Sequence, residues 1–238
     1  MIKGLYTSAT SMSPRMFRQE VAANNLANIN TAGFKKDRFF LRTLMRADRI
    51  LSESEMGIAG QIITDYEEGA LNHTGSPLDL ALRGEGFFTV DTPQGMRYTR
   101  NGHFALNTDG QLVTSEGFVV LGEDGPVEIH GKNVLIAENG EITVDGNVVG
   151  RLLITDFEKP YNLKKLGDSL FVPRSEGEAE GVAENVVVRQ GFLEGSNVRV
   201  VEEMVRMISL SRSYESDQKA IQYQDEALGK AVNEVGRV

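Results

Sequence analysis

The spacing of apolar side chains divides the chain into three parts, and the first covers about residues 1–30. Its apolar positions lie mostly three or four residues apart, and this spacing predicts an amphipathic helix. They are Ile2, Leu5, Tyr6, Ala9, Met12, Met16, Ala23 and Leu26. Pro14 suits the first turn of a helix, so we expect the helix to begin there with Ser13 as its cap. Residues 1–12 are then expected to order only against a partner.

The last part, from Ser196 to about Val235, carries the longest regular stripe. Its positions alternate by three and four residues, and seven of the ten are apolar, which is typical of a helix that packs along a partner. They are Met204, Met207, Ser211, Tyr214, Gln218, Ile221, Asp225, Leu228, Val232 and Val235. A second stripe beside it comprises Val198, Val201, Val205 and Ile208. Ser196 or Asn197 suits the N-cap, with Glu202 and Glu203 close to the positive helix end.

A helix of this length is not stable by itself, because helical stability in water comes mainly from burying an apolar face. We therefore expect it to pair with the first helix in a coiled-coil-like stem. The polar stripe positions Ser211, Gln218 and Asp225 would set the register of that pair at some cost in stability. A pair of ordinary core helices is the alternative.

The middle of the chain has the pattern of a β domain. Of the 25 glycines, 17 lie between Gly84 and Gly195, and many follow Asn, Asp or Glu in pairs that favour tight turns. These pairs are Asn101-Gly102, Asp109-Gly110, Glu116-Gly117, Asp124-Gly125, Asn139-Gly140 and Asp145-Gly146. The strand-like segments between turns include 87–90, 118–121, 134–137, 142–144 and 148–155. Short strands with close turns predict an antiparallel barrel or sandwich.

The predicted fold class is therefore α+β, with paired N- and C-terminal helices and an inserted, mainly antiparallel β domain. We expect residues 1–38 and 195–238 to form the helical stem and residues 66–194 to form the β-rich domain. Residues 39–65 have weaker periodicity and are interpreted as a linker or adaptable arm.

The sequence gives little support for catalysis, metal binding or cofactor binding. There is no cysteine, and His73, His103 and His130 share no spacing that would bring them together on a metal ion. Gly84-Glu85-Gly86 leads into the strand-like segment 87–90 instead of a helix, so it offers no helix N-terminus to a phosphate. We therefore expect a protein that is not an enzyme and has no cofactor.

Charge is unevenly spread along the chain. Residues 1–50 carry nine Lys or Arg and three Asp or Glu, a balance of +6. Residues 51–194 carry ten against 24, a balance of −14, and the remaining residues contribute −1 to the net charge of −9. The basic end and the acidic middle can attract each other between copies, although solvated faces would give the same pattern. Nucleic-acid binding is not expected, because no basic stripe extends beyond the first 50 residues.

The segment Asn24–Lys35 holds four Asn in seven positions, followed by Gly33. Asn competes for backbone hydrogen bonds, so this run predicts a helix end and a turn with positive φ at Gly33. The segment resembles the N-terminal signature of the flagellar axial proteins, the family of rod, hook and hook-associated subunits. The stretches 75–88, 98–104 and 190–198 are similar to the rod-protein pattern in the same order, with a small departure at Glu194-Gly195-Ser196.

The resemblance implies a structural subunit of the flagellar basal-body rod that transmits torque. Family members are exported unfolded by the flagellar type III apparatus without signal cleavage and then assemble helically, with both terminal segments in the inner layer. The expected partners are copies of the chain, other rod proteins and the export apparatus. The short length and compact middle domain look more like a proximal-rod than a distal-rod subunit. The residues that we expect at assembly contacts are Leu5, Leu26, Asn28, Gly33, Phe34, Val205, Ile208, Tyr214, Ile221 and Leu228.

The start of the chain and its apolar runs agree with that route. No apolar run approaches the roughly 20 residues needed to cross a bilayer, so membrane insertion is not expected. The first residues lack the apolar block of about 7–15 residues found in a cleaved secretory signal.

An alternative function assigns binding to the β domain. In this hypothesis Tyr98, His103 and Phe104 form an aromatic contact patch for cell-wall carbohydrate. A hydrolase using Asp or Glu side chains of the β domain is a further alternative, but the sequence singles out no such pair.

Overall fold

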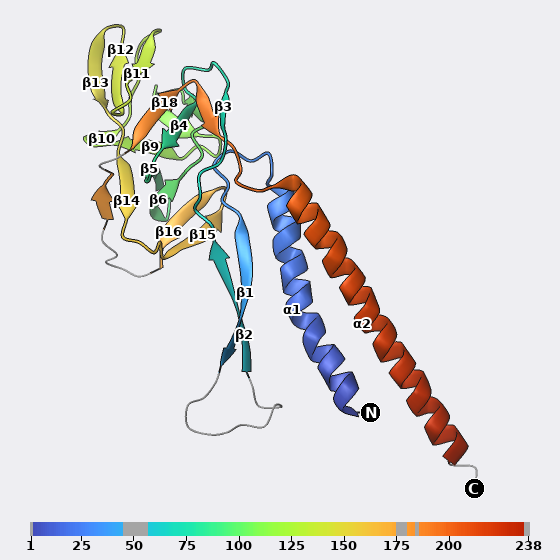
Figure 1. Cartoon of the computed structure of the whole chain (residues 1–238). Helices are drawn as coiled ribbons and strands as arrows, with labels where there is room; N and C mark the ends of the chain where they lie inside the picture. Colours follow the sequence, from blue (N-terminus) through green and yellow to red (C-terminus); the bar gives the residue numbers. More distant parts are fainter. Residues whose placement is uncertain (1, 45–56, 175–179, 184–185, 236–238) are drawn as a thin grey trace. The chain divides into compact units, whose positions relative to one another are not determined.

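The computed structural model describes residues 2–44, 57–174, 180–183 and 186–235. Within these ranges the side chains of 2–11, 42–44, 57–59, 180 and 231–235 are not described. The chain divides into two compact units. We call residues 1–28, 36–65 and 198–238 the helical unit, and residues 29–35 and 66–197 the β unit. Figure 1 shows the elements of each unit.

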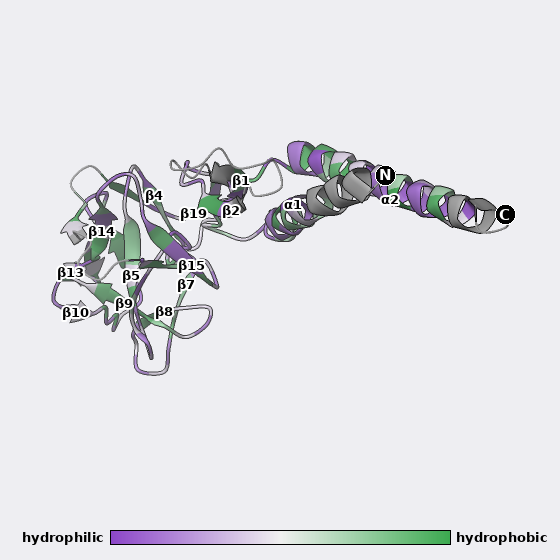
Figure 2. Cartoon of the chain, turned by 90° about the horizontal axis from the view of Figure 1, so that it is seen from below, coloured by the Kyte–Doolittle hydropathy of each residue, from purple (hydrophilic) through white to green (hydrophobic). Residues whose placement is uncertain are grey.

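The helical unit contains α1 (Ile2–Ala27) and α2 (Val200–Val235). The two helices run antiparallel and side by side, as the views in Figures 1 and 2 both show. An ion pair of 2.9 Å between Arg15 Nη1 and Asp217 Oδ2 joins them. At 1.5 Å per residue, α2 is roughly 54 Å long, and pairing with α1 covers one of its faces.

The covered face of α2 differs from the predicted stripe at Met204, Gln218 and Asp225, whereas Ser211 is half-buried. Its buried and half-buried side chains include Glu203, Met207, Leu210, Tyr214, Asp217, Ile221, Gln224 and Leu228. Gln218 and Asp225, which were expected to set the register, are exposed. Asp217 and Gln224 lie on the covered face instead. A carboxylate is tolerated there because Arg15 supplies the opposite charge.

Both helices begin at different residues from those predicted. α1 starts at Ile2 and continues through Pro14, so the prediction of a start at Ser13 was wrong. An internal proline costs about 3 kcal/mol, and packing along α2 offsets this cost. α2 starts at Val200, a few residues after the predicted caps Ser196 and Asn197. The side-chain amide of Asn197 donates to the carbonyl of Glu67 at 3.0 Å within the β unit.

Two paired strands lie in the region that was interpreted as a linker or adaptable arm. β1 (Asp37–Leu44) pairs antiparallel with β2 (Gly57–Thr64), and the ring of Phe39 stacks on Phe17 of α1 with centroids 5.9 Å apart. Asn25, fully buried in α1, fixes where β1 begins. Its side-chain amide donates to the carbonyl of Asp37, and its side-chain oxygen accepts from the N–H of Asp37, both at 2.9 Å. An Asn in the last turns of α1 thus acts as a backbone partner for the first strand.

The β unit is built from antiparallel strands, as predicted. Its largest sheet has ten strands, with the order β15-β16-β6-β5-β9-β8-β7 and with β10, β14 and β17 beside this path. Their bounds are β5 (Phe87–Thr92), β6 (Gly95–Thr99), β7 (Phe104–Leu106), β8 (Leu112–Thr114), β9 (Val119–Gly122), β10 (Gly125–Pro126), β14 (Ile154–Phe157), β15 (Leu163–Gly167), β16 (Leu170–Pro173) and β17 (Glu180–Val182).

Smaller sheets complete the unit. A three-stranded sheet contains β11 (Val134–Ile136), β12 (Glu141–Val144) and β13 (Asn147–Arg151). Two ribbons pair β4 (Leu80–Arg83) with β18 (Val187–Gln190), and β3 (Leu71–His73) with β19 (Phe192–Glu194). The ribbons help to position the candidate functional site. Their second strands, β18 and β19, place residues 187–194 beside residues 71–83. The main core packs aliphatic side chains around Phe88 and Phe104, and a second cluster packs aromatic rings around Phe87.

Most of the predicted turns contain the expected glycine conformation. Gly110, Gly117, Gly125, Gly140 and Gly146 all have positive φ. Gly102 does not, and its reason is space, because an added Cβ would lie 1.7 Å from the carbonyl oxygen of Leu80. The predicted strand 148–155 is two strands, β13 and β14.

Replacing Asn25 with Ala should destabilise the helical unit by about 2–3 kcal/mol, because two hydrogen bonds of about 1–1.5 kcal/mol each are lost. Hydrogen exchange of the β1 amides should accelerate, and urea unfolding gives the free energy. Asn24→Ala, at an exposed neighbouring position, serves as the control and should change stability by less than about 0.5 kcal/mol. Equal effects of the two substitutions would contradict the role given to Asn25.

Candidate functional site

A buried carboxylate lies where the two ends of the β unit meet. Glu194, at the end of β19, is 1% exposed. Its Oε1 accepts from Lys35 Nζ at 2.6 Å and from the N–H of Gly69 at 2.9 Å. Its Oε2 lies 3.3 Å from Arg100 Nη1. We call Glu194, Lys35 and Arg100 the Glu194 cluster.

The two cations of the cluster bind further parts of the backbone. Lys35 Nζ donates to the carbonyl of Glu67 at 2.7 Å. Arg100 Nη2 donates to the carbonyl of Gly84 at 2.7 Å, and the guanidinium lies 5.3 Å from the ring centroid of Phe87. The cluster therefore joins all four stretches that carry the family resemblance, because each contributes a charged side chain or a carbonyl to it.

Burial sets the electrostatics of the cluster. Loss of hydration lowers the pKa of Lys35 from its ordinary value of 10.5, and the neighbouring Glu194 acts in the opposite direction. Because the pKa of Lys35 is lower in the folded state than in the unfolded state, the free energy of unfolding rises as the pH increases from the lowered pKa toward 10.5. Below the lowered pKa this contribution is lost.

Gly33 closes the same region from the N-terminal side. Its φ of +67° confirms the predicted turn, and its N–H donates to the backbone carbonyl of Glu194 at 2.8 Å. An added Cβ would lie 2.3 Å from the backbone carbon of Arg100. Phe34 is buried beside it, with Lys165 Nζ 3.9 Å from the ring centroid. Both residues are thus held within the β unit of their own chain.

The other predicted contact residues lie in the helical unit. Asn28 donates from its side chain to the carbonyl of Asn24 at 2.9 Å and so finishes α1, and Leu26 is half-buried. The side chain of Leu5 is outside the described residues. On α2, Val205 and Ile208 are exposed, whereas Tyr214, Ile221 and Leu228 are half-buried on the covered face. The predicted set therefore does not form one continuous surface.

Sequence reasoning missed the Glu194 cluster. Lys35, Arg100 and Glu194 were each inside a recognised stretch, but none was identified as a partner of another. A usable signal was present in the sequence. Lys35 and Glu194 each directly follow a short apolar segment, shortly before the next strand or helix begins. Spacing could not show that residues 159 positions apart meet.

The aromatic patch proposed for carbohydrate binding does not exist as a surface. Tyr98 is 2% exposed and Phe104 is 3% exposed, because both rings pack in the cores, and His103 alone of the three is exposed. No group of three His, Asp or Glu in the described part of the chain could hold a metal ion. Among the helices of the described residues, none is long and apolar enough to cross a membrane.

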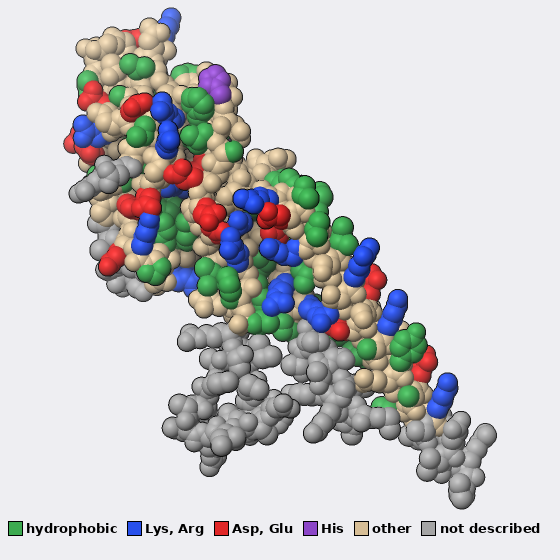
Figure 3. Space-filling model, in the orientation of Figure 1, with side chains coloured by type: hydrophobic (Ala, Val, Ile, Leu, Met, Phe, Trp, Pro, Cys, Tyr) green, Lys and Arg blue, Asp and Glu red, His purple; other side chains and the backbone are tan. Residues whose placement is uncertain are grey.

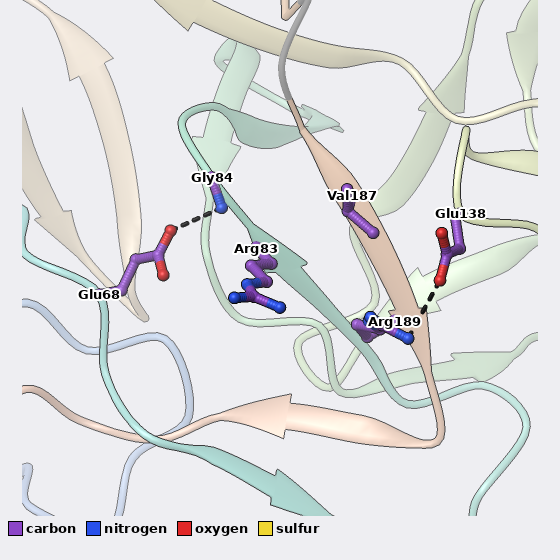
Figure 4. A pocket seen from close by; sticks show the side chains of 6 residues that line it. All are labelled: Glu68, Arg83, Gly84, Glu138, Val187 and Arg189. Atoms are coloured by element: carbon purple, nitrogen blue, oxygen red, sulfur yellow. Dashed lines mark hydrogen bonds and ion pairs between the residues drawn. The ribbon is translucent and has the colours of Figure 1, made fainter.

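Hollows among the described residues of the β unit include the following two. One, of about 580 Å³, is lined by the rings of Tyr66, Phe87 and Tyr161 together with Arg100 and Lys159. The other, of about 420 Å³, has two arginines and two glutamates among its walls (Figure 4). The walls of the larger hollow also include Glu67, Glu68 and Glu85, and Glu85 forms an ion pair with Lys159.

Comparison with known proteins finds three matched family segments in this chain. Residues 5–35 match the family "Flagella basal body rod protein", residues 81–148 match "Flagellar hook protein FlgE/F/G D1 domain", and residues 189–234 match "Flagellar basal body rod FlgEFG protein C-terminal". The flagellar basal-body rod protein FlgG of Borreliella burgdorferi is 33% identical over 98% of both chains. The chain belongs to the flagellar basal-body rod protein family.

Two further relatives of this rod-family protein show the same extent of similarity. The flagellar hook-basal body complex protein FlhO of Bacillus subtilis is 32% identical over the whole of both chains. FlgG of Agrobacterium fabrum is 32% identical over 94% of this chain and 96% of its own. The three matched family segments contain Lys35, Arg100 and Glu194, so the Glu194 cluster joins the matched segments to one another.

Replacing Glu194 with Gln should destabilise this rod-family protein by about 3–5 kcal/mol, because Lys35 and Arg100 would remain as buried charges without their anion. Denaturant unfolding followed by circular dichroism measures the change. The matched control is Glu138→Gln, whose partner Arg189 forms an exposed pair, and it should cost less than about 1 kcal/mol. A Glu194 variant as stable as the control would refute a structural role for the cluster.

Replacing Gly33 with Ala should cost more than about 3 kcal/mol. The left-handed conformation accounts for about 1–2 kcal/mol, and displacement of the Arg100 backbone adds to it. Gly117→Ala shares the positive φ but meets nothing within 4 Å, so it should show the conformational cost alone. Thermal unfolding of both variants separates the two contributions. Equal losses would show that the close approach does not matter.

Proposed function

We propose that this protein is a structural subunit of the bacterial flagellar basal-body rod that assembles through its helical unit. The observation that carries the proposal is an uncovered apolar stripe on α2. Val201, Val205 and Ile208 are 74%, 61% and 53% exposed. Their spacing of four and three residues places them on one face, opposite the face that carries Met207 and Leu210. Figure 3 shows apolar side chains along the outer side of α2.

An isolated subunit gains nothing from exposing these side chains. Buried against a neighbour, each square ångström of apolar surface contributes roughly 25 cal/mol. A stripe that meets a different surface of the next copy makes a heterologous contact, and such contacts extend as a helix when they do not close into a ring. In this proposal α1 and α2 form a coiled-coil-like stem, and torque passes through the packed helices of neighbouring stems.

The family supports a place in the flagellar basal body, with other rod proteins as neighbours. Export through the flagellar type III apparatus belongs to the same proposal.

The alignment with the Borreliella burgdorferi relative spans 268 positions, more than the 238 residues of this chain, so the relative has segments that this chain lacks. That shortness favours the proximal-rod F subunit over the distal-rod G subunit.

The double variant Val205→Asp with Ile208→Asp should fold normally yet fail to enter the rod. Both side chains are exposed, so their replacement leaves the core intact, whereas burying two carboxylates in an apolar contact costs several kcal/mol. Circular dichroism of the purified chain checks folding, and isolation of basal bodies from cells with this variant as their only copy checks incorporation. Gln222→Asp, an exposed polar position on the same helix, is the control. Normal incorporation of the double variant would refute the proposal.

Ile221→Asp and Leu228→Asp test the covered face. Both side chains are half-buried on α2, so these changes should loosen the pairing of α1 with α2 by about 2 kcal/mol or more each. The β unit should stay folded and rod incorporation should be lost. Amide hydrogen exchange measures the protection of the helical unit and of the β unit separately. Motility and rod assembly that survived both changes would contradict the stem.

A further inference from the structure

Two arginines on neighbouring strands face one hollow of the β unit. In the ribbon of β4 and β18, Val187 lies opposite Arg83. Arg189, two residues further along β18, therefore shares a face with Arg83. The hollow has a volume of about 420 Å³, and Figure 4 shows both side chains at its walls together with Glu68 and Glu138. We call it the Arg83 hollow.

The charges around the Arg83 hollow are unequally satisfied. Arg189 Nη1 lies 3.0 Å from Glu138 Oε1. Glu68 Oε1 accepts a hydrogen bond of 2.6 Å from the N–H of Gly84. Arg83 makes no hydrogen bond or ion pair with the other residues that the structure describes. A guanidinium group offers forked donors that match a carboxylate, so the hollow has an open place for an anionic group.

The surrounding chain supplies few cations and many carboxylates. Residues 51–194, which include most of the β unit, have a balance of −14. Two copies of an acidic unit repel each other unless carboxylates of one copy face Arg or Lys side chains of the other. A carboxylate of a second copy is therefore the occupant that the charge distribution favours.

A suitable donor lies on another part of the same unit. The turn between β9 and β10 presents Glu123 and Asp124, which are adjacent and exposed. A Cβ added to the next residue, Gly125, would meet nothing within 4 Å, so the turn is open to solvent. Glu123 lies 3.6 Å from Arg151 in an exposed pair, which contributes little. Asp124 has no ion pair with the described residues.

We propose that the Glu123–Asp124 turn of one copy docks in the Arg83 hollow of a second copy. Two neighbouring carboxylates then face two neighbouring guanidinium groups. The two surfaces are different, so the contact is heterologous and can repeat along a helical assembly. The inference rests on the proposed function, because it adds a contact between β units to the contact between helices.

Because the chain has no cysteine, two introduced cysteines can report the proposed contact by forming a disulfide. Asp124→Cys and Val187→Cys are combined in the full chain, which keeps Glu123 and both arginines, and basal bodies are isolated under oxidising conditions. We expect disulfide-linked multimers that disappear on reduction, with no multimers from either single-cysteine variant. Assembled basal bodies without the cross-link would overturn this inference and leave the rod function standing.

If the cysteine variants do not assemble, swapping the charges of the two proposed partners tests the same contact. Arg83→Glu should reduce rod incorporation, and the double variant Arg83→Glu with Asp124→Arg should restore it. Lys132→Glu, an exposed position of the same unit outside the hollow, is the control and should assemble normally. Normal incorporation of Arg83→Glu, or no rescue in the double variant, would overturn the inference. The Val205 and Ile208 variant tests the proposed function separately.

Discussion

The burial of one carboxylate is the constraint on which the β unit depends. Glu194 has no access to water, so its charge is tolerated only while Lys35, Arg100 and the Gly69 N–H surround it. These groups come from four distant places in the chain, and each must be in position for the others to be satisfied. The requirement fixes the turn at Gly33, which brings Lys35 into place, and it fixes the return of β19 beside β3. A single polar centre therefore determines how the two ends of the β unit meet.

The helical unit is organised by a different principle. Its ion pairs each keep at least one partner partly exposed, as in Arg206–Glu203 and Arg38–Asp65, and α2 leaves the stripe at Val201, Val205 and Ile208 exposed. Its internal contacts are a covered helix face, the Arg15–Asp217 pair and the fit of Asn25 to the first strand. The β unit is thus tied together around one buried ionic centre, whereas the helical unit is held by helix packing and a few polar contacts.

Local features of the fold could be predicted from the sequence, and distant pairings could not. Antiparallel strands and five of the six glycine turns followed from β-branched segments and Asn-Gly, Asp-Gly or Glu-Gly pairs, because these signals act over a few residues. The covered face of α2 was predicted correctly at Met207, Tyr214, Ile221 and Leu228. It was wrong at Met204, Gln218 and Asp225, because a polar Asp217 on that face becomes acceptable only through Arg15 on another helix. The Glu194 cluster was missed for the same reason, since no periodicity relates Lys35 to Glu194. Pro14 misled the prediction because tertiary packing outweighed its local preference.

The division of the chain into units has a consequence for how load is carried. The polypeptide passes between the helical unit and the β unit at four points, after residues 28, 35, 65 and 197. A pull or twist on one unit therefore reaches the other along four covalent paths in parallel, instead of through a lone hinge. No single break in the backbone can separate the two units. In a protein that works in a rotating shaft, such redundancy spreads mechanical stress over several peptide bonds.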